Sequence, residues 1–136
     1  MLQQPYETGH IEPHDQSTQG VPVPVVGGFD LIPLHTLIFL KADGNYTELH
    51  HITEKEGKKV LTKTLSSKGL KFFEEKLTGY PFMRIHDSYI VNLTKINKYV
   101  REGKEGRVVL YNGKSLVVSR TRKNQLLSAF GLSHEE

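Results

Sequence analysis

The chain has 136 residues, 37% of them hydrophobic, and a formal net charge of +3, which allows one domain with a packed core and little besides. Its longest apolar run, Leu37–Leu40, is far shorter than the ~20 residues of a membrane-spanning helix, so no membrane association is expected. The chain has no cysteine, which excludes a disulfide framework and a cysteine metal site and is compatible with a cytoplasmic protein.

The charge is distributed unevenly along the chain. Residues 1–40 carry four acidic residues and no lysine or arginine, whereas residues 41–134 carry all 18 lysines and arginines against nine acidic residues. Without a basic n-region, the N-terminus does not resemble a secretory signal. The basic block fits a polyanionic partner such as nucleic acid, or equally a well-solvated surface, and charge alone does not choose between them.

The first segment, residues 1–28, is rich in proline, glycine and glutamine and has no apolar periodicity. It is therefore predicted to be a flexible tail or linker, whose deletion would leave the melting temperature nearly unchanged. His10 and His14 have the spacing of a helical metal site, but Pro13 lies between them and no acid or third histidine completes a set, so no metal is expected. The domain itself is expected over residues 29–131, with a C-terminal tail at 132–136.

From Phe29 onward the pattern is one of short strands separated by turn residues. Two stretches instead have helical periodicity: residues 66–77, with Ser66 or Ser67 as N-cap, and residues 119–130, ended by Gly131. Asn112-Gly113 predicts a type I′ hairpin turn. The spacing favours a mainly β fold in a sandwich or barrel-like stack, with strands at residues 29–34, 35–42, 45–52, 58–63, 82–86, 89–92, 95–100, 106–111 and 114–119.

The run His86-Asp87-Ser88 contains the residue types of a hydrolytic triad. Neighbouring residues on a strand point to opposite faces, however, so three contiguous side chains do not converge as catalysis requires. No G-x-S-x-G motif surrounds Ser88. We therefore expect no enzymatic activity and no catalytic residue, and we interpret the run as a loop presented to solvent or to a partner.

Arg120, Arg122 and Lys123 crowd the predicted first turn of the last helix, where the helix dipole is already positive. The placement favours a bound anion such as a phosphate, although solvent screening would also tolerate it. The chain has no P-loop, and its paired glutamates at 54/56 and 74/75 fit a solvated surface. No cofactor is implied.

Four motifs together resemble the LytTR family of bacterial DNA-binding domains, over about residues 29–130. They are "ADGNYTEL" (42–49), "TLSSKGLKFFEEKL" (64–77), "FMRIHDSYIVNLTKI" (82–96) and "LVVSRTRKNQL" (116–126). The resemblance implies antiparallel strands in stacked sheets, an elongated β sandwich, with one or two short helices. It also implies transcription regulation within two-component systems, often as a homodimer on direct repeats and often behind a receiver domain. A receiver domain needs on the order of a hundred residues, so it would belong to a longer or a separate chain.

Carried over to this sequence, the resemblance matches Thr47, Asp87 and Arg120 to positions that contact DNA. Their neighbours complete the candidate set: Asn45, Tyr46, His86, Arg122 and Lys123. The resulting hypothesis is a sequence-specific regulator of transcription that binds double-stranded DNA. The chain departs from the family by having Asp87 where a basic or neutral polar residue is usual, and Lys41 where an acid is common. The alternative is therefore a protein-interaction module on the same fold that has lost DNA binding.

Overall fold

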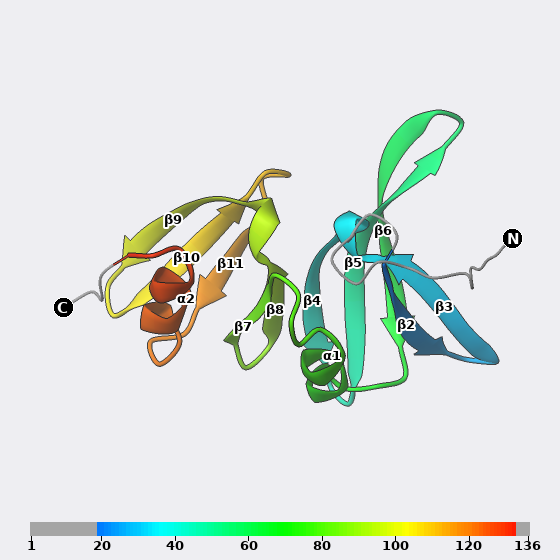
Figure 1. The fold of residues 1–136 in the computed structure, drawn as a ribbon, viewed down its shortest axis with the longest axis horizontal. Helices are drawn as coiled ribbons and strands as arrows, with labels where there is room; N and C mark the ends of the chain where they lie inside the picture. The colour runs from blue at the N-terminus through cyan, green and yellow to red at the C-terminus, as the bar shows by residue number, and fades with distance from the viewer. Residues whose placement is uncertain (1–18, 133–136) are drawn as a thin grey trace, which may run out of the picture.

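The computed structural model describes residues 19–132 and is built mainly from β-strands, as predicted (Figure 1). The two α-helices are α1 (Leu70–Lys76) and α2 (Lys123–Ala129), and 3₁₀ turns lie at Leu34–Thr36 and Leu93–Lys95. The strands are β2 (Gly20–Val25), β3 (Gly28–Pro33), β4 (Leu37–Asp43), β5 (Tyr46–Lys55), β6 (Lys58–Ser66), β7 (Phe82–His86), β8 (Tyr89–Asn92), β9 (Ile96–Glu102), β10 (Glu105–Leu110) and β11 (Ser115–Val118).

The strands form three antiparallel sheets arranged in layers along the long axis of the molecule (Figure 1). The central sheet has five strands in the order β6-β5-β4-β8-β7, and both of its faces are covered. The β2–β3 hairpin and α1 cover one face, enclosing a cluster that we call the hairpin core: Val21, Val23, Ile32, Leu34, Leu37, Leu40, Leu49, Leu70, Phe73, Leu77 and Ile90. The β9–β11 sheet and α2 cover the other, enclosing the C-terminal core: Ile38, Phe39, Ile85, Val91, Val108, Leu110, Leu116, Val118 and Leu126.

Strand β4 supplies buried side chains to both cores. Leu37 and Leu40 enter the hairpin core, whereas Ile38 and Phe39 enter the C-terminal core. Two consecutive residues share a face here because the register with β5 shifts between Leu37 and Phe39, as a β-bulge allows. The run of four apolar residues noted in the sequence is thus a strand buried on both sides.

The prediction of a flexible tail over residues 1–28 is wrong for its last part. Gly20–Val25 form strand β2, which pairs with β3. Val21 and Val23 point into the hairpin core, and the alternating Pro22 and Pro24 point away from it. Proline lacks the N–H that a ladder needs, but in a two-stranded hairpin every second N–H faces outward, so proline is tolerated there. Residues 1–18 and 133–136 lie outside the described residues, so the remaining tail predictions stay predictions.

Val23 gives a direct test of this hairpin. Its side chain is 0% exposed, whereas the nearby Val26 is 100% exposed. Val23→Ala is expected to lower the free energy of unfolding by roughly 1.5–3 kcal/mol, the value of burying an aliphatic side chain. Val26→Ala is the matched control and should leave urea denaturation unchanged. Equal midpoints for the two variants would show that β2 does not pack on the domain.

Both helices begin later than the sequence pattern predicts. The N-cap of α1 is Gly69, and the Ser66 hydroxyl instead donates to the Pro24 carbonyl at 2.8 Å, tying the sheet to the hairpin. Helix α2 begins at Lys123 with Arg122 as its N-cap, so Arg120 and Arg122 precede its first turn. The predicted type I′ turn at Asn112-Gly113 is also wrong. Such a turn needs a positive φ at both residues, and only Gly113 has one, at 90°.

Strand β6 is an edge of the central sheet, and its hairpin with β5 projects from the body of the molecule (Figure 1). Leu61 and Leu65 on this edge are half-exposed, and Lys59 and Lys63 alternate with them along the strand. The hairpin tip is wholly charged apart from Gly57. The tip lies at the end of the sheet opposite the β4–β5 turn.

His50 and His51 are neighbouring residues of β5, the first partly buried and the second buried. The ring of His50 stacks on Phe39 with centroids 4.2 Å apart, and its Nε2 lies 3.1 Å from Glu48 Oε1. His51 Nε2 lies 2.9 Å from the hydroxyl of Thr64. Burial lowers the pKa of both imidazoles below the usual 6.5, because it disfavours the charged ring, and in His50 the hydrogen bond to Glu48 only partly opposes this.

These lowered pKa values make the fold sensitive to acid. Below pH ~6.5 the unfolded chain binds protons that the folded chain does not, so stability is full above that pH and falls as the pH is lowered. His50→Phe keeps a ring against Phe39 and cannot titrate, so its melting temperature should fall less than that of the wild type between pH 7 and pH 5. His35→Gln, at an exposed position, is the control and should follow the wild type. An unchanged drop in His50→Phe would contradict the prediction.

Candidate nucleic-acid interface

Three turns lie along one edge of the molecule. They are the β4–β5 turn, the β7–β8 turn and the β11–α2 loop, all at the lower side of the view in Figure 1. The Ala42 N–H donates to the Ser88 carbonyl at 2.8 Å, which joins the first two turns, and the Ser119 N–H donates to the Ile85 carbonyl at 2.9 Å, which joins the last two. We call this surface the turn edge and define it as residues 43–46, 86–88 and 119–123.

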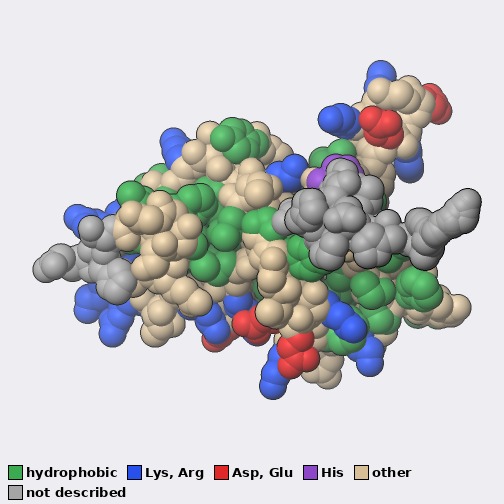
Figure 2. All heavy atoms as spheres, in the orientation of Figure 1, with side chains coloured by type: hydrophobic (Ala, Val, Ile, Leu, Met, Phe, Trp, Pro, Cys, Tyr) green, Lys and Arg blue, Asp and Glu red, His purple; other side chains and the backbone are tan. Residues whose placement is uncertain are grey.

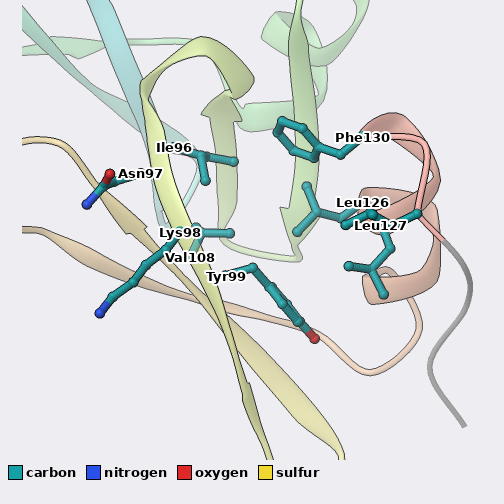
Figure 3. Close-up of a pocket in the computed structure, with 9 residues that line it drawn as sticks. Ile96, Asn97, Lys98, Tyr99, Val108, Leu126, Leu127 and Phe130 are labelled. Atoms are coloured by element: carbon teal, nitrogen blue, oxygen red, sulfur yellow. The ribbon is translucent and has the colours of Figure 1, made fainter.

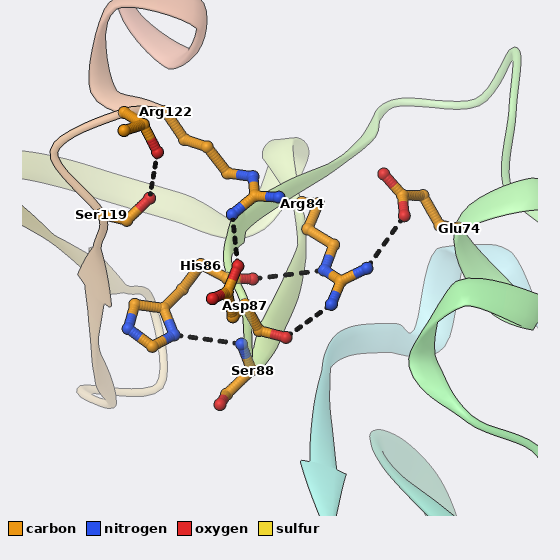
Figure 4. A network of polar contacts seen from close by, with 8 residues as sticks. Glu74, Arg84, His86, Asp87, Ser88, Ser119 and Arg122 are labelled. Atoms are coloured by element: carbon orange, nitrogen blue, oxygen red, sulfur yellow. Dashed lines mark hydrogen bonds and ion pairs between the residues drawn. The ribbon is translucent and has the colours of Figure 1, made fainter. Parts of the chain in front are cut away.

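Arg84 fixes the conformation of the β7–β8 turn (Figure 4). Its Nη2 donates to the Asp87 carbonyl at 2.6 Å, its Nε to the His86 carbonyl at 3.3 Å, and its Nη1 to the Glu74 carboxylate of α1 at 3.0 Å. All three guanidinium nitrogens are therefore used within the protein. Arg84 is a clamp that holds the turn to α1, and its charge is already paired.

Asp87, at the tip of this turn, forms an ion pair with Arg122. Arg122 Nη1 lies 2.9 Å from Asp87 Oδ1, joining residues 35 positions apart (Figure 4). The Asp87 side chain is 88% exposed and that of Arg122 is 29% exposed. The hydrogen bond from Arg122, and then its positive charge, hold the pKa of Asp87 below its usual 3.8, so the carboxylate is ionised at neutral pH. The acid that departs from the family pattern thus has a cationic partner.

His86 has a defined orientation in the same turn. Its Nδ1 accepts a hydrogen bond from the Ser88 backbone N–H at 3.0 Å, which leaves Nε2 as the protonated nitrogen of the neutral ring. The ring packs beside Tyr89 with centroids 5.7 Å apart. His86 therefore offers a hydrogen-bond donor at the turn edge. Asp87 and Ser88 form the turn that follows β7, and the side chains of Arg84 and His86 hold it through hydrogen bonds to its backbone.

The β4–β5 turn presents Asn45 and Tyr46 to solvent but does not present Thr47. Thr47 is 0% exposed, and its hydroxyl is a buried side-chain polar atom without a hydrogen-bond partner in the described part of the chain. It is paired in register with Ala42 and Ser66 inside the sheet. The expected base contact of Thr47 is therefore out of reach in this conformation, and Asn45 and Tyr46 are the exposed residues of this turn.

The remaining candidates lie in the β11–α2 loop and at the start of α2. Arg120 is exposed, whereas Arg122 and Lys123 are partly buried. Lysine and arginine side chains occur along the lower edge in Figure 2, with acidic side chains between them. The structure thus brings together seven of the eight predicted site residues, all except Thr47.

Sequence reasoning missed Arg84 and Glu74, which hold this edge in place. Arg84 lies in β7, and its three acceptors lie in the β7–β8 turn and in α1. No local spacing marks such a contact. An arginine two residues before a tight turn, close enough to reach its carbonyl groups, is the one signal that the sequence offers.

The role of Arg84 as a clamp is testable by Arg84→Lys, which keeps the charge and loses the three-way donor geometry. The change is expected to lower the free energy of unfolding by about 1 kcal/mol and to speed amide hydrogen exchange at Ser88. Arg120→Lys, at an exposed arginine of the same edge, serves as the control and should alter neither quantity. Wild-type exchange at Ser88 in Arg84→Lys would show that the turn holds itself.

An apolar hollow lies away from the turn edge, between β9 and α2 (Figure 3). Its volume is about 220 Å³, and its lining includes Tyr99, Leu126 and Phe130. It contains no set of converging acid, base or nucleophile groups. Within residues 19–132, no cluster of three or more histidine, aspartate or glutamate side chains is arranged to hold a metal ion, and no helix is long and apolar enough to cross a membrane.

Comparisons with known proteins agree with this architecture. A family model described as the LytTr DNA-binding domain matches residues 28–131. A comparison with curated proteins found no match. Among solved structures, the LytTr DNA-binding domain of a response regulator from Bacillus cereus is similar, with a TM-score of 0.61 and 22% sequence identity. The match covers 85% of this chain and 99% of that one, and at this identity it supports the shared fold.

Proposed function

We propose that this chain, which belongs to the LytTr DNA-binding domain family, binds double-stranded DNA sequence-specifically through its turn edge and thereby regulates transcription. The family is one of DNA-binding regulatory domains. The main support for sequence-specific binding is that three turns form a single edge. These turns are joined by the Ala42–Ser88 and Asp87–Arg122 contacts. Rigidly held turns suit insertion into DNA grooves because little freedom is lost on binding.

The side chains of the turn edge divide by chemistry into two roles. Arg120 is exposed and carries the planar donor fork that pairs with the O6 and N7 of guanine, and Asn45 and His86 offer further hydrogen-bonding groups to base edges. Lys123, and Lys41 just outside the edge, carry single charges suited to phosphates, which give affinity and register without reading sequence. Tyr46 adds an exposed aromatic ring beside Asn45.

The proposal extends to the setting of the domain. A DNA partner implies action in the bacterial cytoplasm, and the family's association with response regulators implies control by a receiver domain, in a longer or a separate chain. Homodimers on direct repeats fit the same picture. Each bound copy would then contribute one turn edge, and the spacing of the repeats would follow from the geometry of the pair.

Arg120 provides the sharpest test of base reading. After selection of bound sites from random DNA, Arg120→Ala is expected to weaken binding to the selected site by ~1–3 kcal/mol. Arg120→Lys keeps the charge but loses the fork, so it should lose specificity while keeping its affinity for a scrambled duplex. Fluorescence anisotropy over a salt series measures both. Lys123→Ala should weaken both duplexes alike and flatten the salt slope by about one unit.

The control for these variants is Lys59→Ala. Lys59 is exposed on the β5–β6 hairpin, at the end of the sheet opposite the turn edge, and should not alter binding. Wild-type protein that selects no sequence and shows no salt dependence would contradict the proposal. That result would instead support the alternative of a protein-interaction module on this fold.

A further inference from the structure

Asp87 and Arg122 meet at the centre of the turn edge, and both are anchored through their backbones. The carbonyls of His86 and Asp87 are held by Arg84, and the Ser88 N–H is held by His86 Nδ1. The backbone N–H of Arg122 donates to the Ser119 carbonyl at 3.0 Å, and its carbonyl accepts from Leu126 at 3.0 Å. The ion pair therefore joins two fixed points of the protein.

We infer that Asp87 is a positioning residue that holds Arg122 in place for base recognition. The ion pair lowers the affinity for DNA of any sequence and raises the selectivity for the target sequence. The inference rests on the proposed DNA-binding function. An unpaired arginine attracts any phosphate, whereas an arginine with a carboxylate at 2.9 Å carries little net charge towards the backbone of DNA. Asp87 thus lowers binding to all sequences and leaves the donor geometry of Arg122 intact.

The geometry leaves binding capacity on both partners. Arg122 Nη1 donates to Asp87, and within the described residues Nη2 and Nε have no protein acceptor. These two nitrogens remain as donors. Asp87 Oδ1 accepts from Arg122, and Oδ2 belongs to a side chain that is largely solvent-exposed. Two arginine donors fit the O6 and N7 of guanine, and a free carboxylate oxygen fits the exocyclic amine of cytosine. The pair is therefore expected to read a guanine and a neighbouring cytosine as one unit.

Presetting also reduces the conformational cost of binding. A free arginine side chain loses rotamer freedom when it contacts a base, and Arg122 has already lost part of that freedom in the ion pair. An exposed ion pair contributes little to the stability of the fold. Substitutions at either residue should therefore leave the domain folded, so binding can be compared directly.

The test is a double-mutant cycle of Asp87→Asn and Arg122→Ala, measured on the selected duplex and on a scrambled duplex at one salt concentration. Asp87→Asn should raise affinity for the scrambled duplex by up to about fivefold and lower the selected-to-scrambled affinity ratio. Arg122→Ala should lower that ratio by about tenfold or more. In the Arg122→Ala background, Asp87→Asn should change the ratio by less than about twofold, because both the arginine contact and the ion pair that holds the carboxylate in place are gone.

Asp43→Asn is the matched control, because it removes the same charge from an exposed acid of the same edge whose side chain has no hydrogen bond or ion pair within residues 19–132. It should raise affinity for both duplexes alike and leave the ratio unchanged. Two outcomes would overturn this inference and leave the proposed function standing. In the first, Asp87→Asn changes the affinity ratio equally with and without Arg122; in the second, it behaves like Asp43→Asn. Equal affinity of the wild-type protein for both duplexes would overturn it together with the proposed function.

Discussion

The burial of β4 and β8 on both faces is the constraint on which the rest of the structure depends. Leu40 and Ile90 are committed to one core, and Phe39 and Val91 to the other. A one-residue slip would exchange these sets, so the register of the strand pair is strongly determined. The turn edge begins where these two strands end, and its geometry is therefore set by packing several residues away. The close packing of the two cores thus fixes the positions of the turns at the surface.

The alternation of apolar and polar residues predicted strands correctly where the strand follows that pattern. Strands β7 and β8 have the bounds expected from "FMRIH" and "YIVN", because each is short and is flanked by turn residues. The same reasoning failed at β2, where Pro22 and Pro24 read as breakers of structure although every second residue of a two-stranded hairpin can be proline. Helix starts failed as well, since Ser66 uses its hydroxyl to bind the hairpin and not to cap α1.

The candidate site was predictable in its location and not in its contacts. The resemblance matched Asp87 and Arg120 to DNA-contacting positions, and both lie in connections at strand ends, which are exposed in most folds. It also placed Thr47 at the interface, where the alternation of β5 instead points the side chain inward. The Asp87–Arg122 pair joins residues 35 positions apart and the Arg84–Glu74 pair joins different elements, so neither is encoded in local spacing. An acid judged unfavourable by comparison alone is neutralised by a partner that only folding supplies.

The lysines of β6 have a consequence for how these domains behave when crowded together. A long edge strand with half-exposed leucines is a template on which a second chain can add as a new strand. Lys59 and Lys63 lie among these leucines, and pairing two such edges would strip water from several ammonium groups at once. The penalty keeps neighbouring copies from fusing into a continuous sheet. Under the proposed function, this penalty would let several molecules occupy adjacent sites on DNA without aggregating at the high local concentration.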